Sequence, residues 1–181
     1  VTYLPNTANN MVSLPKTETV IDASTNILRS SLVNYNPYGK PAHIHTLIND
    51  TTKTVTHITY DDYGNITGII YPTDVNGDNN WTSYDYDSIT YSQITAIDNP
   101  FRERTLTDYD YRWQSPLSSI DPAGNTIRYS YDYQGRLIKI TAPEELKKGE
   151  DYTIRYTYNF VGHNLKTLPT YLHTHVYKEL Y

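Results

Sequence analysis

The sequence predicts an all-β fold, an array of antiparallel β-hairpins that forms a curved or spiralling sheet. Short segments in which apolar or aromatic residues alternate with polar ones are separated by Gly, Pro, Asn or Asp, which is typical of strands and turns. A tyrosine followed by Asp or Asn returns at intervals of 22 to 27 residues, and a period of this length indicates stacked supersecondary units. Tyrosine contributes 20 residues, against 2 Phe and 2 Trp, so the apolar surface is expected to be largely phenolic.

The repeats organise the whole chain. Residues 1–21 lead into the array, residues 22–160 hold about six two-strand repeats, and residues 161–181 begin a further repeat or a connecting segment. A single two-strand unit cannot bury its apolar face, so each repeat must be stabilised by its neighbours in a continuous sheet. The chain reads as a fragment of a longer array, and its end strands are expected to be open to self-association.

One motif places a tyrosine at the end of a strand and a glycine in the turn that follows. Its copies are Tyr35 with Gly39, Tyr60-Asp61 with Gly64, and Tyr131-Asp132 with Gly135 and Arg136. The alternating pattern around the second copy predicts strands over residues 55–60 and 65–71. Around the third copy it predicts strands over residues 126–132 and 137–141. Each copy therefore predicts one β-hairpin.

A second turn alternates with the first. Its clearest copy is Asp121-Pro122-Ala123-Gly124-Asn125, and residues 22–27 and 78–82 are weaker copies. Asp, Asn and Gly favour turns because their side chains cap the local backbone or tolerate left-handed φ. The tyrosine motifs at Tyr86-Asp87 and Tyr109-Asp110 lack a nearby glycine and are expected to be degenerate copies.

Residues 121–126 followed by Tyr131-Asp132-Tyr133-Gln134-Gly135-Arg136-Leu137 resemble the YD-repeat (Rhs repeat) family, whose units alternate these two motifs. The resemblance extends from about residue 22 to residue 160. It implies a non-catalytic structural segment of a large secreted or surface bacterial protein, similar to Rhs polymorphic toxins, wall-associated proteins and the B/C components of toxin complexes. It also implies that this segment belongs to a β-shell, with the flanking repeats of the parent chain and an enclosed toxin or effector domain as partners. The cleavage region of such relatives is not recognisable here, so autoproteolysis is not carried over.

The composition argues against several kinds of partner. The formal net charge is −5 and the longest basic run is the pair Lys147-Lys148, which disfavours nucleic acid and anionic membranes. Cysteine is absent, which excludes a disulfide framework and thiolate metal sites. The apolar runs are only a few residues long, so no transmembrane segment is expected.

The stretch from Asp74 to Asp85 raises the alternative of a calcium site. Oxygen-bearing side chains fall at the positions by which a twelve-residue loop surrounds Ca²⁺, and the candidate ligands are Asp74, Asn76, Asp78, Asn80 and Asp85. The stretch departs from the usual pattern, because Asn79 replaces a glycine and Asp85 replaces a longer glutamate. The other reading is a polar hairpin tip, since residues 78–82 align with the second turn.

The histidines form two spaced pairs, His43 with His45 and His173 with His175, and each pair is expected on one face of a strand. Zinc needs three or four protein ligands, and nothing in the sequence brings His57 or another ligand to either pair. Histidines on a half-exposed sheet are therefore the expectation. No nucleophile elbow and no convergent carboxylate pair is present, so we expect neither a catalytic residue nor a cofactor beyond the calcium alternative.

The tyrosines themselves allow two functions. Cross-strand aromatic pairs stabilise a sheet by about 0.2–1 kcal/mol each, and their recurrence at the turns favours this structural role. Exposed tyrosines, with Trp81 and Trp113, would instead stack on sugar rings. The alternative function is thus a surface carbohydrate-binding or adhesion module, with or without calcium. Buried tyrosines favour the shell, whereas a row of exposed ones favours the binding module.

Overall fold

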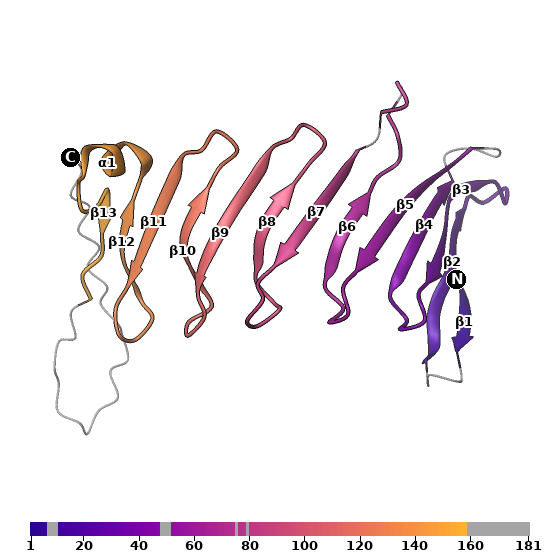
Figure 1. Cartoon of the computed structure of the whole chain (residues 1–181). Helices are drawn as coiled ribbons and strands as arrows, with labels where there is room; N and C mark the ends of the chain where they lie inside the picture. Colours follow the sequence, from indigo (N-terminus) through magenta and orange to yellow (C-terminus); the bar gives the residue numbers. More distant parts are fainter. Residues whose placement is uncertain (7–10, 48–51, 75, 79, 159–181) are drawn as a thin grey trace. The chain divides into compact units, whose positions relative to one another are not determined.

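The computed structural model describes residues 1–6, 11–47, 52–74, 76–78 and 80–158. The predicted connecting segment at 161–181 and the pair His173 and His175 lie outside the described residues. The all-β prediction is confirmed, because the described residues form thirteen strands and one short helix (Figure 1). The strands are β1 (Thr2–Asn6), β2 (Met11–Ile21), β3 (Ile27–Tyr35), β4 (Pro41–Leu47), β5 (Lys53–Tyr60), β6 (Ile66–Ile70), β7 (Trp81–Tyr86), β8 (Ile94–Asp98), β9 (Arg104–Asp110), β10 (Ser115–Ile120), β11 (Thr126–Tyr131), β12 (Leu137–Thr141) and β13 (Ile154–Arg155).

The chain divides into two compact units. The first comprises residues 1–85 and 97–103, and the second comprises residues 86–96 and 104–181. In the first unit, strands β1 to β7 pair antiparallel, each with the next. In the second unit, β9 to β13 pair in the same way. This succession of hairpins is the one that the turn spacing predicts.

The pairing is irregular beside each tyrosine of the three clearest motifs, because the partner strand there holds one extra residue. The pairing register shifts between Asn34 and Tyr35, between Thr59 and Tyr60, and between Ser130 and Tyr131. Each tyrosine is then paired with the residue six positions later, namely Pro41, Ile66 and Leu137. Such a bulge bends the strand that carries the extra residue and increases the local twist, so each motif tyrosine lies at a point where its hairpin is strongly twisted.

The two turn motifs of the sequence adopt one geometry. In each, the first residue receives two hydrogen bonds from the turn: its carbonyl oxygen accepts from the fourth residue's N–H, and its side-chain oxygen accepts from the fifth residue's N–H. The first residues are Asp22, Asn36, Asp61, Asp74, Asn99, Asp121 and Asp132. The fourth residue has positive φ, which explains the recurring glycine; Thr25 at 67° and Arg102 at 62° are the departures.

The turn predicted at residues 78–82 is wrong. The turn there spans residues 74–78, and Trp81 and Thr82 already belong to β7. The sequence offered two overlapping Asp/Asn/Gly clusters in this region, and only the one with Gly77 at its fourth position fits the turn geometry, with φ of 82°.

One short helix, α1 (Pro143–Lys148), lies between β12 and β13. Its first residue is a proline, and Gly149 ends it in the left-handed conformation with φ of 73°. No helix in the described ranges is long and apolar enough to cross a bilayer.

The sheet has almost no apolar core of its own. Among the described residues, Ala96 is the single buried apolar side chain, and the buried polar residues are Asp87 and Thr141. Large apolar side chains such as Tyr133 and Tyr38 are more than four-fifths exposed. A sheet of this size normally buries at least one face against another layer. The described residues bury almost no apolar side chain, so they provide no such layer.

Candidate functional site

The motif tyrosines bond the repeats to one another through their hydroxyl groups. Each hydroxyl donates a hydrogen bond to a backbone carbonyl of a strand earlier in the chain, at 2.6 to 2.9 Å. The pairs are Tyr35 with Pro15, Tyr60 with Pro41, Tyr131 with Pro116 and Tyr158 with Leu137. Burial raises the pKa of Tyr60 and Tyr131, as expected for half-buried phenols. The predicted structural role of these tyrosines thus includes a specific backbone acceptor.

A basic residue after the turn glycine covers the tyrosine ring of the next repeat. The guanidinium of Arg136 lies 4.5 Å from the centroid of the Tyr158 ring, and the ammonium of Lys40 lies 5.3 Å from that of Tyr60. Lys40 also donates a hydrogen bond to the Gly64 carbonyl. Cation–π contacts of this kind stabilise most where the ring is partly desolvated. The basic residue therefore has a role between repeats that its position in the motif alone does not reveal.

Arg136 is held in place by its own turn. Its Nε donates to Oδ2 of Asp132 at 2.7 Å, and an Nη lies 2.6 Å from the same oxygen. Desolvation raises the pKa of Asp132, but the hydrogen bonds from Arg136 and the turn outweigh it and leave that pKa below its ordinary value. The Asp and the Arg of the motif thus act together to aim the guanidinium at Tyr158.

The turn glycines are also points of close approach. A Cβ on Gly135 would lie 2.6 Å from Cδ2 of Trp113, which belongs to the turn between β9 and β10. Met11 covers Gly39 and Lys40 covers Gly64 in the same way in the first unit. Positive φ favours glycine at all three positions, and at Gly135 the rigid Trp113 ring also leaves no room for a side chain.

The degenerate motif at Tyr86-Asp87 contains the most enclosed carboxylate among the described residues. Asp87 is 3% exposed and accepts hydrogen bonds from the N–H groups of Ile89, Ser92 and Gln93 and from the Thr90 hydroxyl, at 2.8 to 3.1 Å. Desolvation raises its pKa, but these donors outweigh that effect and lower the pKa strongly. The missing glycine is thus replaced by a longer turn organised around one carboxylate.

The candidate calcium ligands are divided between a turn and a strand. Oδ1 of Asp74 accepts the N–H groups of Asn76 at 2.8 Å and Asp78 at 3.0 Å, and these bonds lower the pKa of Asp74. Asp78 and Asn80 line a hollow of about 350 Å³ with Asp74, whereas Asp85 lies exposed within β7. No group of three His, Cys, Asp or Glu side chains converges on one point within the described ranges. The calcium loop stays a prediction.

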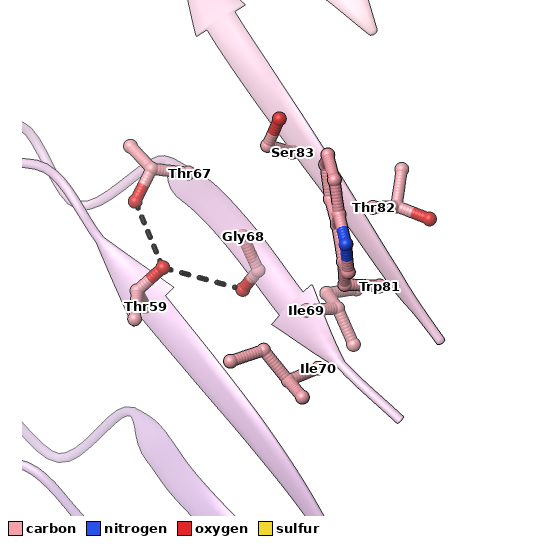
Figure 2. A pocket seen from close by; sticks show the side chains of 8 residues that line it. All are labelled: Thr59, Thr67, Gly68, Ile69, Ile70, Trp81, Thr82 and Ser83. Carbon is pink, nitrogen blue, oxygen red and sulfur yellow. Dashed lines mark hydrogen bonds between the residues drawn. The ribbon is translucent and has the colours of Figure 1, made fainter. Parts of the chain in front are cut away.

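A second hollow, of about 400 Å³, lies on the sheet where β5, β6 and β7 run side by side (Figure 2). Gly68 leaves it open, because a Cβ there would lie 2.9 Å from the Thr59 hydroxyl oxygen. The Trp81 indole borders the hollow, and the hydroxyls of Thr59, Thr67 and Ser83 also line it. An aromatic ring beside hydroxyl groups is suited to a ligand with both apolar and polar faces.

The structure brings together histidines that the sequence kept apart. His43 and His57 are cross-strand partners on β4 and β5, and their rings are 4.6 Å apart. His45 lies two residues after His43 on β4, and the centroids of the two rings are 6.5 Å apart. The antiparallel register, which the sequence does not specify, is what places His57 here.

Comparison with known proteins finds a family match to one segment of the chain and a low similarity to several solved structures. The RHS Repeat family model matches residues 116–145. No curated protein matches the chain. Among solved structures, the complex of TcdB2, TccC3 and Cdc42 is 15% identical with a TM-score of 0.45, over 79% of this chain and 10% of that one. The Photorhabdus luminescens Tc holotoxin pore is 15% identical with a TM-score of 0.44, over 88% of this chain and 10% of that one.

The matched segment contains both turn motifs and one motif tyrosine. Residues 116–145 contain β11 and β12, the Asp121 and Asp132 turns, and the Tyr131 hydroxyl bond to Pro116. The chain spans about a tenth of the length of the solved structures it matches. Residues 116–145 of this chain, within an antiparallel β-sheet, are therefore an RHS repeat.

Proposed function

We propose that the array is a non-catalytic wall segment of a larger β-shell, which encloses a toxin or effector domain of a secreted or surface bacterial protein. The observation that carries this proposal is the uncovered sheet: Ala96 is the one buried apolar side chain among the described residues. Such a sheet needs further protein against at least one face. In a shell, the flanking repeats continue the sheet and the enclosed domain lies against its inner face.

The contacts between repeats support a wall. The hydroxyl bonds and the cation–π contacts join adjacent repeats. They hold neighbouring hairpins in a fixed relation, as a continuous wall requires. The RHS match at residues 116–145 is consistent with this role, and the division into about six repeats over residues 22–160 forms part of the proposal.

An apolar dye whose fluorescence rises on exposed hydrophobic surface tests the uncovered sheet. The chain is expected to bind the dye strongly while its circular dichroism shows ordered β-structure and its thermal unfolding is cooperative. Weak dye binding by a cooperatively folded monomer would contradict the proposal, because the sheet would then be covered.

A carbohydrate-binding module is the second candidate, and two observations favour it. The hollow beside Trp81 combines an aromatic ring with threonine and serine hydroxyl groups. Tyr38 and Tyr63, 82% and 63% exposed, lie on turns between β3 and β4 and between β5 and β6. Their exposure is what such a module requires, whereas Tyr35 and Tyr60 are half-buried.

Tryptophan fluorescence titrated with soluble oligosaccharides separates the two candidates. A binding module predicts saturable quenching that Trp81→Ala abolishes and Trp113→Ala leaves in place, since Trp113 rests on Gly135. The shell predicts no saturable signal with any oligosaccharide. Binding that survives both substitutions would assign neither tryptophan to a sugar site.

A further inference from the structure

The cluster of His43, His45 and His57 is the one group of metal-ligating imidazoles that the described residues bring into contact. His43 and His57 are opposite each other on β4 and β5, with ring centroids 4.6 Å apart at an interplanar angle of 85°. Directly opposite residues have Cβ atoms about 4.5–5.5 Å apart, so both side chains leave the same face of the sheet from nearly the same place.

We propose that His43 and His57 form a two-histidine site for a divalent transition-metal ion, with Cu²⁺ bound most tightly. Imidazole nitrogens bind Zn²⁺ at about 2.0–2.1 Å, so two nitrogens on one ion lie roughly 3 Å apart. Rotation of the two rings about their side-chain bonds turns the edge-to-face pair into a chelate without moving the backbone. The Irving–Williams order places Cu²⁺ above Ni²⁺ and Zn²⁺ at such a nitrogen site.

The surroundings of the pair suit a cation. The cross-strand neighbours on the other sides are Asn34 for His43 and Ile70 for His57, and neither carries a charge. The His57 side chain is exposed, so the ion can reach the site and water can complete its coordination. No positive side chain stands at the paired positions to repel a metal ion.

His45 is the natural third ligand, but another contact engages it. Its Nε2 lies 3.3 Å from the side-chain amide nitrogen of Asn34. This contact explains why the three imidazoles do not converge in the described conformation. The site is therefore a chelate of two imidazoles, with His45 held aside by Asn34.

Metal binding here would join two strands. An ion held by His43 on β4 and His57 on β5 binds the folded hairpin and not the unfolded chain, so it stabilises the fold by mass action. The second prediction concerns Asn34, because its removal frees His45 to become a third ligand. Asn34→Ala should therefore tighten Cu²⁺ binding by about tenfold, the scale on which an outer-shell partner changes metal affinity.

Calorimetric titration of the full chain with Cu²⁺ tests the proposal. The background carries Ala at His163, His173 and His175, so that the three clustered histidines are the remaining imidazoles. We expect saturable binding of one ion, a rise in Tm on adding Cu²⁺, and a loss of affinity of at least about tenfold in His57→Ala. His45→Ala is the matched control on the same face and should keep the affinity within about threefold.

Two outcomes overturn the proposal. One is Cu²⁺ binding by His57→Ala that is as tight as in the parent chain, because the pair would then not be the ligand set. The other is the absence of saturable binding in a parent chain whose circular dichroism shows the folded sheet. The His57→Ala variant should fold, since its side chain is exposed, and its Tm without metal confirms this.

Discussion

The guanidinium of Arg136 lies over the ring of Tyr158, 4.5 Å from its centroid, while the Tyr158 hydroxyl donates to the carbonyl of Leu137, the residue after Arg136. Lys40, Tyr60 and Pro41 repeat this arrangement in the first unit. The basic residue that ends one turn and the first residue of the following strand thus hold one tyrosine of the next repeat, by its face and by its hydroxyl. This contact accounts for the basic residue that follows the turn glycine at Gly39-Lys40 and at Gly135-Arg136.

Removal of one tyrosine hydroxyl should weaken the fold measurably. In Tyr60→Phe the Pro41 carbonyl loses its donor, and we expect the free energy of unfolding to fall by about 1 kcal/mol. Tyr131→Phe should behave alike in the second unit through Pro116. Tyr38→Phe is the control, because that side chain is 82% exposed. Denaturant unfolding measures all three, and an equal loss in the control would contradict the proposed bond.

A double-mutant cycle tests the contact between Arg136 and Tyr158. Arg136→Gln and Tyr158→Leu should show a coupling free energy of about 0.5–1 kcal/mol, the scale of a partly exposed cation–π contact. Arg112→Gln combined with Tyr158→Leu is the control cycle, since Arg112 pairs with Asp110 and its side chain is 79% exposed. A control coupling as large as that of Arg136 would show that the effect is not specific to the contact.

Two turn glycines separate backbone strain from packing. Both have positive φ, 81° for Gly124 and 77° for Gly135, but a Cβ on Gly124 meets no atom within 4 Å, whereas one on Gly135 meets Trp113. Gly124→Ala should cost about 1–2 kcal/mol from strain alone. Gly135→Ala should cost more and should shift the Trp113 fluorescence. If the two substitutions lowered the free energy of unfolding equally and left the Trp113 fluorescence unchanged, the contact between Gly135 and Trp113 would be contradicted.

Asp87 should make the fold sensitive to acid. Its pKa is lowered from the ordinary 3.8, so its contribution to stability is complete above pH 3.8 and is lost as the pH falls below that value. In Asp87→Asn an amide NH₂ group, which cannot accept hydrogen bonds, replaces an oxygen that accepts from backbone N–H groups. The Tm should therefore fall by roughly 5 °C at neutral pH. Asp62→Asn, at an exposed turn position, is the control. Melting curves from pH 7 to pH 2 measure both, and an unchanged acid limb in Asp87→Asn would contradict this role.

The sequence was sufficient for the hairpins and for most of the turns. The residues that define a turn lie within five positions, so Asp61 and Gly64, or Asp121 and Gly124, were recognisable by local chemistry alone. It was insufficient where two clusters overlapped: only the structure shows that the turn begins at Asp74 and that Trp81 lies in a strand.

The contacts between strands were beyond the sequence for a different reason. The acceptor of the Tyr60 hydroxyl lies 19 residues away, and the partner of His43 lies across a loop on another strand. Both depend on pairing register, which a bulge shifts beside every clear motif tyrosine. The sequence showed that a tyrosine recurs at this position of the repeat, but not which backbone carbonyl accepts its hydrogen bond.

Size-exclusion chromatography with light scattering, with and without millimolar Ca²⁺, tests the central claim that this sheet is part of a larger wall. We expect the 20.9 kDa chain to self-associate, because its sheet is uncovered, and we expect Ca²⁺ to change nothing, because the turn already occupies Asp74. A Ca²⁺-dependent change in mass would instead assign the stretch from Asp74 to Asp85 as a calcium site. A discrete, folded monomer under all conditions would contradict the wall and favour an autonomous binding module.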